Sequence, residues 1–350
     1  MNMRKIFSLI IVSLSVVVYA QKASNAQFTQ VGKTVEITYT LDKQADIVVY
    51  LSTDGGRTFG ASPLKAVTGD VGNGVTAGQK KIIWSPFDEY EKLVCDNAVF
   101  KIVPSGGEKL SFTVGGVPFT MIKVEGGTFT MGCTSEQSDC DSDEERTHQV
   151  TLSDYYIGQT EVTQALWQAV MGTTIRQQRD KADKSWSMRG EGANYPMYYI
   201  SYTECQEFII KLNNLTGRKF ALPTEAQWEF AARGGRKSGH YKFAGSNTIG
   251  NVAWYDGNSN SLTHPVALKT PNELGLYDMS GNVWEWCYDW YGEYSSSSQT
   301  NPHVASSGQY RVNRGGSWDN DARHCRVSYR YNSSPSNRNY NIGFRLVLLP

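Results

Sequence analysis

The feature that most limits the possible folds is the long stretch after Gly235, which shows neither helical nor strand periodicity. It consists mainly of Gly, Asn, Ser and aromatic residues. The whole chain carries 33 Gly, 20 Tyr and 9 Trp, while charged residues make up only 19%. In such a chain, aromatic side chains supply much of the buried area that regular elements usually supply. We therefore predict an α+β fold with little regular secondary structure.

Three segments before Gly235 have helical spacing. Apolar residues recur on one face in 160–171 and in 203–215. Thr163 is placed to cap the first of these helices. The segment 224–233 starts with Thr and has Gln three residues later, which is a capping box followed by a glycine stop. Helices are expected here, and no further helix or long strand is expected after Gly235.

Residues 28–104 predict a separate all-β domain. Residues 35–39 alternate apolar and polar side chains, and 47–51 form a short continuous apolar run. Further strands are expected at 81–84 and 99–103, with glycine-rich turns between the runs. This pattern favours an Ig-like or fibronectin-like sandwich. A linker is expected over 105–116, and the second domain over 117–350.

The N-terminus has the order of a secretory signal. Arg4 and Lys5 precede an apolar run that ends at Ala20, and small polar residues follow. We predict a signal peptide over 1–20, with cleavage after Ala20 or after Ala26; an uncleaved membrane anchor is the alternative. No Cys follows the apolar run, which argues against a lipid anchor, and no other stretch is apolar enough to span a bilayer. The expected location is secreted or periplasmic, where disulfides and calcium sites persist.

Charge is balanced, with 34 Lys plus Arg against 34 Asp plus Glu. Nothing in it suggests attraction to nucleic acid or to an anionic membrane. The acidic run 139–145 is expected to be a solvated loop. Of six cysteines, Cys133 and Cys140 lie close enough in sequence to form a local disulfide, although sequence alone does not fix the pairing.

Five motifs occur in one order along the second domain. They are M-I-K-V-E-G-G-T-F-T-M-G (121–132), Y-Y-I-G-Q-T-E-V-T (155–163), L-P-T-E-A-Q-W-E-F-A-A-R-G-G (222–235), N-E-L-G-L-Y-D-M-S-G-N-V-W-E-W (272–286), and R-V-N-R-G-G-S-W (311–318) with N-I-G-F-R (341–345). In this order they resemble the formylglycine-generating enzyme, or sulfatase-modifying factor, family over roughly 230 residues. The resemblance implies an elaborated C-type-lectin-like fold.

The resemblance also implies calcium. The D-x-x-G-x-V-x-E segment places two carboxylates around a turn, and calcium prefers six to eight hard oxygen ligands. The matching ligands are the side chains of Asp278 and Glu285 and the carbonyls of Gly281 and Val283. A tight turn with both carboxylates bonded to backbone is the alternative. A second calcium site would fall at Asn251, Val252 and Asp256, where this sequence departs from the family pattern.

The implied catalytic site is incomplete. Family enzymes hold Cu(I) between two thiolates, which are soft ligands for a soft ion. Alignment on Gly315-Gly316-Ser317 places the second thiolate at Cys325 and the first at Asn320, which is no thiolate. His324 is adjacent to Cys325 and, on an extended chain, would point to the opposite side. Cys287 is a partner only if the fold brings it close; otherwise Cys325 is a small buried apolar residue.

Two functions follow. One is a non-catalytic protein that uses a calcium-stabilised scaffold to bind a protein or a glycan at the cell envelope. The other is a copper-dependent oxidase that converts a sulfatase cysteine to formylglycine with dioxygen. In both cases Trp284, Ser317 and Cys325 are expected to line the ancestral pocket, and Arg314 and Arg345 to pair with carboxylates or carbonyls. The five scattered histidines form no H-x-x-x-H metal pair.

Overall fold

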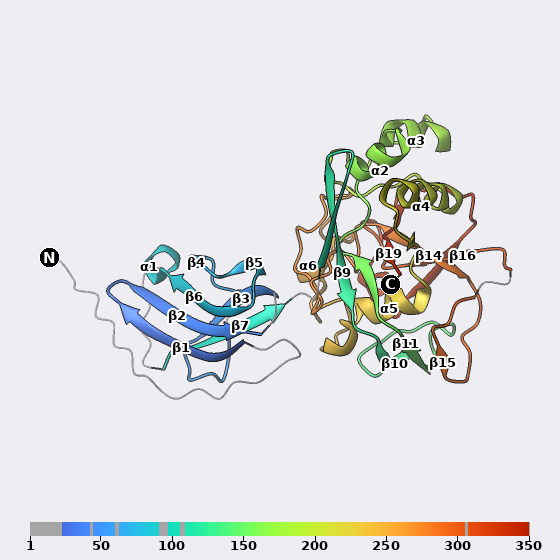
Figure 1. The fold of residues 1–350 in the computed structure, drawn as a ribbon. Helices are drawn as coiled ribbons and strands as arrows, with labels where there is room; N and C mark the ends of the chain where they lie inside the picture. The colour runs from blue at the N-terminus through green and yellow to red at the C-terminus, as the bar shows by residue number, and fades with distance from the viewer. Residues whose placement is uncertain are drawn as a thin grey trace. The chain divides into compact units, whose positions relative to one another are not determined.

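The computed structural model describes residues 23–42, 45–59, 63–90, 97–105, 109–304 and 307–349. The chain divides into two compact units, Met1–Glu108 and Lys109–Pro350 (Figure 1). Each unit has its own buried core. The predicted signal peptide and Cys95 lie outside the described residues.

The first unit consists of two antiparallel sheets around one core. One sheet has the order β1-β2-β6-β4 and the other β5-β3-β7. Its strands are β1 (Ala23–Val31), β2 (Thr34–Leu41), β3 (Ala45–Ser52), β4 (Val67–Gly69), β5 (Gly72–Val75), β6 (Gly78–Trp84) and β7 (Val99–Ser105), with the single helical turn α1 (Pro86–Glu89). Alternate residues of β2 and β3 enter the shared core, as the period of two predicts. The four expected strands are confirmed, and cleavage after Ala26 would fall inside β1.

The second unit is built on three small sheets. The five-stranded sheet has the order β13-β19-β12-β9-β8, the four-stranded sheet β17-β16-β14-β18, and the three-stranded sheet β10-β11-β15. Their strands are β8 (Lys109–Val114), β9 (Val117–Val124), β10 (Gly127–Met131), β11 (His148–Leu152), β12 (Tyr155–Gly158), β13 (Phe220–Ala221), β14 (Trp284–Trp290), β15 (Gln299–Thr300), β16 (Arg311–Arg314), β17 (Arg330–Ser333), β18 (Ile342–Gly343) and β19 (Val347–Leu348).

Two expectations about strands were wrong. Part of the expected linker 105–116 is strand β8, which pairs along its length with β9 through a hairpin. Strand β14 was not expected, yet it is seven residues long. It lies between β16 and β18, and residues on both of its faces are buried, including Glu285 and Asp289 between the aromatic residues.

Helices α2 to α5 of the second unit each begin at a Ser or Thr whose side chain caps the first turn. They are α2 (Gln164–Met171), α3 (Ile175–Ala182), α4 (Tyr202–Thr216), α5 (Glu225–Ala232) and α6 (Ile249–Val252), with 3-10 turns η1 (Gly235–Lys237) and η2 (Ala322–Cys325). The three expected helices are confirmed as α2, α4 and α5, and Thr163 and Thr224 cap α2 and α5. Helix α3 was missed, although its Thr174–Gln177 capping box is a recognisable signal. None of the helices in the described ranges is long and apolar enough to cross a bilayer.

Aromatic side chains fill the core of the second unit. Trp167, Trp228 and Trp286 are all fully buried. Trp167 stacks on Phe208 with ring centroids 5.5 Å apart, where α2 packs beside α4 (Figure 1). The expected role of aromatic residues in the core is therefore confirmed.

Candidate functional site

The segment between β16 and β17 carries Ser317, Asn320 and Cys325, the residues that the motifs were expected to match to a copper site. Gly315 and Gly316 have φ values of 97° and 73°, a conformation that other residues rarely adopt. A Cβ atom on Gly316 would lie 2.7 Å from the Cys325 sulfur, so the backbone packs directly on this thiol. The turn η2 follows, capped by the Asp321 carboxylate, which accepts hydrogen bonds from the Arg323 and His324 amides. This arrangement brings Ser317, Asn320 and Cys325 close together.

The Ser317 hydroxyl contacts the side chains of Asp319 and Asn320 in this turn. Its Oγ lies 2.6 Å from Asp319 Oδ1 and also contacts the Asn320 amide. One hydroxyl has one proton, which it donates either to Asp319 Oδ1 or to Asn320 Oδ1. Asn341 Nδ2 donates to Asp319 Oδ1 at 2.9 Å. The position of the first copper ligand is therefore occupied by an amide inside a hydrogen-bond network.

Cys325 behaves as an apolar side chain. It is fully buried and packs with Phe243 and Val252. Burial first, and then the negative charges of Asp321 and Asp256, raise the pKa of the Cys325 thiol. The other free cysteines of the described chain, Cys205 and Cys287, belong to two different buried clusters. The residues present therefore do not fit a bis-thiolate copper site.

His324 does not complete the site either. The expectation of an extended chain was wrong, because His324 and Cys325 lie in a 3-10 turn. The two side chains nevertheless separate: His324 Nδ1 lies 2.6 Å from Asp321 Oδ1 on the exposed side of the turn. Cys325 points into the core.

Trp284 lies beside this network rather than inside it. Its ring stacks on Tyr331 with centroids 5.3 Å apart, and its backbone amide donates to the Asn341 carbonyl. Because Asn341 also bonds Asp319, it links Trp284 to the Ser317 turn. Two buried polar atoms of this region, Asn341 Oδ1 and Trp318 Nε1, have no hydrogen-bond partner.

The acidic run 139–145 is not a solvated loop, contrary to expectation. Glu144 is fully buried and receives two hydrogen bonds from Arg326, at 2.7 and 2.8 Å. Asp141 pairs with Arg323. The disulfide between Cys133 and Cys140, one of the pairings that the sequence allowed, closes the loop. The loop therefore clamps the segment that carries Cys325, through contacts about 180 residues apart in sequence.

The predicted calcium ligands lie in a buried turn. Asp278 has a φ of 57°; its Oδ2 accepts from the Ala267 amide at 2.8 Å, while Oδ1 has no partner. A Cβ on Gly281 would lie 2.2 Å from the Trp254 carbonyl, so glycine is required there. Glu285 is neutralised by Arg345, whose Nε and Nη2 lie 2.6 Å from its two oxygens.

The unpartnered Asp278 oxygen fits a cation, whereas Glu285 adds no net charge for one. Within the described ranges, no three His, Cys, Asp or Glu side chains form a group that could hold a metal. A calcium ion here would therefore depend on backbone carbonyls, including those of Gly281 and Val283, and on water.

At the second predicted calcium position, Asn251 and Asp256 are exposed and Val252 is buried beside Cys325. The Asp256 amide donates to the Asn320 carbonyl, which ties this segment to the ancestral site. The structural roles expected of Arg314 and Arg345 are confirmed: Arg314 pairs with Glu229 and with carbonyls of residues 327–329.

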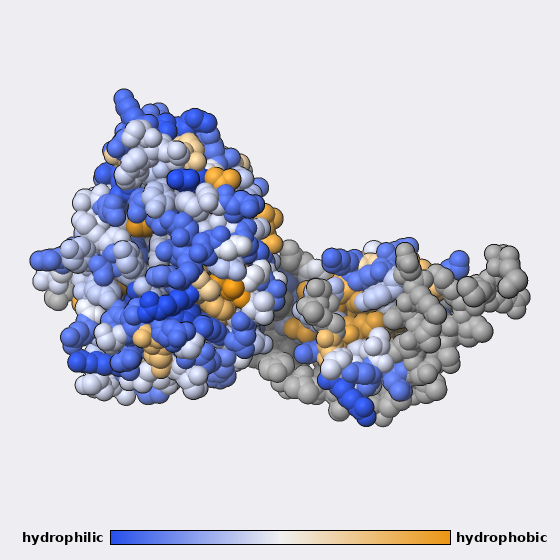
Figure 2. Space-filling model, turned by 180° about the vertical axis from the view of Figure 1, so that it is seen from behind, coloured by the Kyte–Doolittle hydropathy of each residue, from blue (hydrophilic) through white to orange (hydrophobic). Residues whose placement is uncertain are grey.

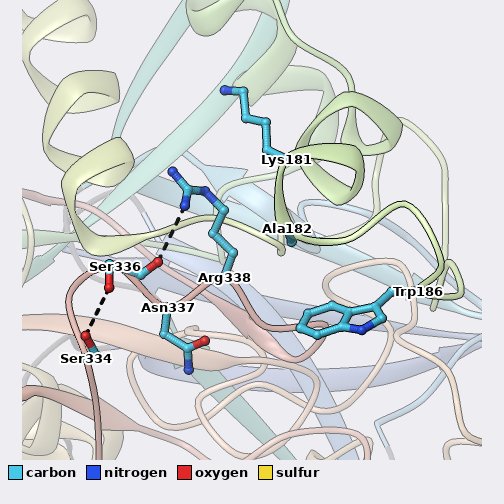
Figure 3. A pocket seen from close by; sticks show the side chains of 7 residues that line it. All are labelled: Lys181, Ala182, Trp186, Ser334, Ser336, Asn337 and Arg338. Atoms are coloured by element: carbon cyan, nitrogen blue, oxygen red, sulfur yellow. Dashed lines mark hydrogen bonds between the residues drawn. The ribbon is translucent and has the colours of Figure 1, made fainter.

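Two of the surface pockets on the described part of the second unit are lined by residues other than Ser317, Asn320 and Cys325. One, of about 350 Å³, is lined by Lys181, Ala182, Trp186, Ser334, Ser336, Asn337 and Arg338 (Figure 3). The other, of about 670 Å³, lies around Phe129, Arg233 and His240. The face of this unit seen in Figure 2 is mostly hydrophilic, with small scattered hydrophobic patches.

Comparison with known proteins decides the family. The model of the sulfatase-modifying factor enzyme 1-like domain matches residues 116–349, about two thirds of the chain. The chain belongs to the sulfatase-modifying factor family. Two curated relatives are the chaperone protein LppX of Paenibacillus barcinonensis (32% identity; 60% of this chain, 82% of the relative) and the formylglycine-generating enzyme of Streptomyces coelicolor (29%; 64% and 87%). The solved structure of Treponema denticola variable protein 1 matches with a TM-score of 0.61 and 34% identity, over 69% of this chain and 99% of that one.

Proposed function

We propose that this chain is a non-catalytic member of the sulfatase-modifying factor family that binds a protein partner or a glycan at the cell envelope. The observation that carries the proposal is the side chain at position 320. Asn320 offers only hard oxygen and nitrogen, and it already bonds Ser317. The remaining cysteine, Cys325, is a buried thiol whose raised pKa opposes formation of a thiolate.

Location outside the cytoplasm is part of the proposal. The N-terminal sequence has the order of a secretory signal, and the second unit holds the Cys133–Cys140 disulfide. Disulfides persist in oxidising compartments and are rare in reducing ones. We therefore propose a secreted or periplasmic protein.

The pocket drawn in Figure 3 has the chemistry of a glycan or polar peptide contact. Trp186 is 37% exposed and presents a ring against which an apolar sugar face can pack. Lys181 and Arg338 border it with donor groups, although both share the Glu204 carboxylate, at 3.1 and 2.9 Å. Because one carboxylate faces two cations, the trio keeps one net positive charge.

Two further features support a binding role. One relative is named a chaperone protein, a name that implies contact with another protein. The first unit, with two sheets around one core, agrees with an Ig-like or fibronectin-like sandwich serving as a spacer or adhesion module, by analogy of fold alone. We also propose calcium as a structural ion at Asp278, Gly281, Val283 and Glu285, with a second ion at Asn251, Val252 and Asp256.

The alternative is formylglycine-generating oxidation of an exported sulfatase with Cu(I). It is favoured by the similarity to formylglycine-generating enzymes and by the presence of both Ser317 and Cys325. It requires a second soft ligand besides Cys325, since one thiolate does not hold Cu(I) tightly.

Mass spectrometry of a peptide with a Cys-x-Pro-x-Arg core separates the two functions. The mature protein is incubated with the peptide, Cu(I), a reductant and air, beside an intact two-cysteine relative as positive control. We expect the relative to convert cysteine to the aldehyde and this protein to leave the peptide unchanged. Conversion by this protein, and its loss in Cys325→Ala, would overturn the non-catalytic proposal.

A further inference from the structure

The two cationic side chains of the pocket in Figure 3 keep donors that no carboxylate takes up. Glu204 accepts from Lys181 Nζ at 3.1 Å and from Arg338 Nε at 2.9 Å, so each cation uses one donor on it. Arg338 Nη1 makes only a long contact of 3.5 Å with the Ser336 carbonyl, and Nη2 has no partner among the described residues. The side chains of Lys181 and Arg338 are 48% and 31% exposed. An anion in this pocket therefore meets free donors on both cations.

The charged groups beside the pocket on α3 do not cancel its positive charge. Arg179 and Asp180 pair with each other at 2.7 Å. Asp183 and Lys184, which follow the helix, are both exposed and carry opposite charges. The single positive charge that the Glu204 trio leaves is therefore kept.

Trp186 supplies a fixed aromatic face next to these cations. Its ring packs on Tyr199 with centroids 5.8 Å apart. Arg179 Nη1 donates to the Trp186 carbonyl at 2.8 Å, and the Trp186 amide donates to the Asp183 carbonyl at 3.1 Å. A ring that is already held in place loses little conformational freedom when a ligand packs on it.

The rest of the lining is short and polar. Ser334, Ser336 and Asn337 present hydroxyl and amide groups, while Ala182 is the one small apolar lining residue besides Trp186. None of the lining residues belongs to a strand, so the pocket offers no strand edge to an extended peptide. Its volume of about 350 Å³ lies within the range of about 300–1,000 Å³ that is typical of ligand pockets.

We propose that this pocket binds an acidic glycan, with a carboxylate or sulfate of the sugar on Arg338 and Lys181 and an apolar face of a sugar ring on Trp186. The inference rests on the proposed binding function and names its ligand class. A neutral sugar can use the same ring and hydroxyls, but it leaves the free donors of both cations to water. Because charge-assisted hydrogen bonds are stronger than neutral ones, the acidic group decides the preference.

The test is titration calorimetry of the mature protein with four probes. Oligogalacturonate carries carboxylates, and its methyl ester is the neutral match with the same sugar backbone. A heparin-derived oligosaccharide adds sulfates, and a polyglutamate peptide carries carboxylates without a sugar. We expect at least one of the acidic sugars to bind about 10-fold more tightly than the methyl ester, and the comparison of the two shows whether carboxylate or sulfate is preferred.

Variants locate the binding in this pocket. Arg338→Gln and Lys181→Gln should each weaken binding of the acidic sugar about 10-fold, and Arg338→Lys, which keeps the charge, should weaken it less. Trp186→Ala should weaken it about 5-fold. Lys211→Gln is the matched control and should bind as wild type does, because Lys211 is exposed on α4 and does not line the pocket. If Arg338→Gln does not fold, Lys181→Gln carries the test, since this side chain is half exposed.

Four results would overturn the proposal. In the first, the methyl ester binds as tightly as the acidic sugars. In the second, polyglutamate binds as tightly as they do and is weakened by the same variants, so the ligand is a peptide. In the third, Lys211→Gln weakens binding as much as Arg338→Gln, which indicates diffuse charge attraction. In the fourth, no probe binds.

These failures are distinct from failure of the proposed function. A preference for the methyl ester or for polyglutamate would leave a binding role in place. Oxidation of the sulfatase-type peptide would instead overturn that role, and it would leave the sugar titrations unchanged because none of the probes involves copper or Cys325.

Discussion

The buried ion pair between Glu144 and Arg326 ties the acidic loop to the Cys325 segment, and its loss should be costly. Both side chains are fully buried, and the guanidinium also donates to the Arg323 and Asp139 carbonyls. Arg326→Met keeps the stem but leaves Glu144 charged and unpaired inside the protein. Removing one partner of a buried pair costs about 3–5 kcal/mol. In a unit of this size that corresponds to a fall in Tm of about 10 °C.

Thermal unfolding of the mature chain, followed by tryptophan fluorescence, measures this loss. Of the nine tryptophans only Trp84 lies in the first unit, so the signal reports the second. The control is Arg176→Met, which breaks a two-point pair with Glu191 whose side chains are 61% and 40% exposed. Because water screens this pair, its loss should leave the Tm almost unchanged. Adding Glu144→Gln to Arg326→Met should recover about 1.5 kcal/mol, because the stranded charge is gone. Equal losses in Arg326→Met and in the exposed control would refute this reasoning.

Three further predictions concern stability. Replacing Cys133 and Cys140 by Ser should lower the free energy of unfolding by about 2.5 kcal/mol in non-reducing buffer, and no change would mean that the loop's ion pairs hold it alone. Burial would raise the pKa of Glu204, but hydrogen bonds from the Ser201 amide and the charges of Arg338 and Lys181 lower it to about 2. The ionised carboxylate therefore contributes about 3 kcal/mol of stability above pH 4.5, and this contribution is lost as the pH falls towards 2. Urea titrations should show the difference in free energy of unfolding between wild type and Glu204→Gln shrinking over that pH range. Cys325→Ala should lower the free energy of unfolding, measured by urea titration, by about 1 kcal/mol, as expected for a small buried apolar side chain. A loss above about 4 kcal/mol would show that Cys325 does more than fill space in the core.

Local signals in the sequence predicted much of the fold. Alternation in 35–39 predicted β2, and capping residues predicted α2 and α5, because both signals depend only on neighbouring residues. Helix α3 has a capping box but little apolar periodicity, since only Ile175 and Gln178 are buried. Strand β14 has an aromatic residue at every second position, which is the period of a strand, so a local signal for it was present in the sequence.

The candidate site was only partly predictable. The motifs placed Ser317, Asn320 and Cys325 near one another, and the structure keeps them close. The pairing of Glu144 with Arg326 and the approach of Glu161 to Asp278 join residues more than 100 positions apart in the chain. Such partners depend on the fold of the whole domain. An acidic run in isolation therefore looked solvated, and Glu161 looked like part of a helix start.

Titration with Cu(I) under anaerobic, reducing conditions tests the central claim most directly, through wild type, Asn320→Cys and Cys325→Ala. The Asn320 backbone carbonyl accepts from the Asp256 amide, a bond that does not involve the replaced side chain. If the site lost copper through this one position, wild type should not compete with a Cu(I) chelator, whereas Asn320→Cys should gain tight binding through two thiolates. Tight Cu(I) binding by wild type that disappears in Cys325→Ala would contradict the account and show that Cys325 has another soft partner.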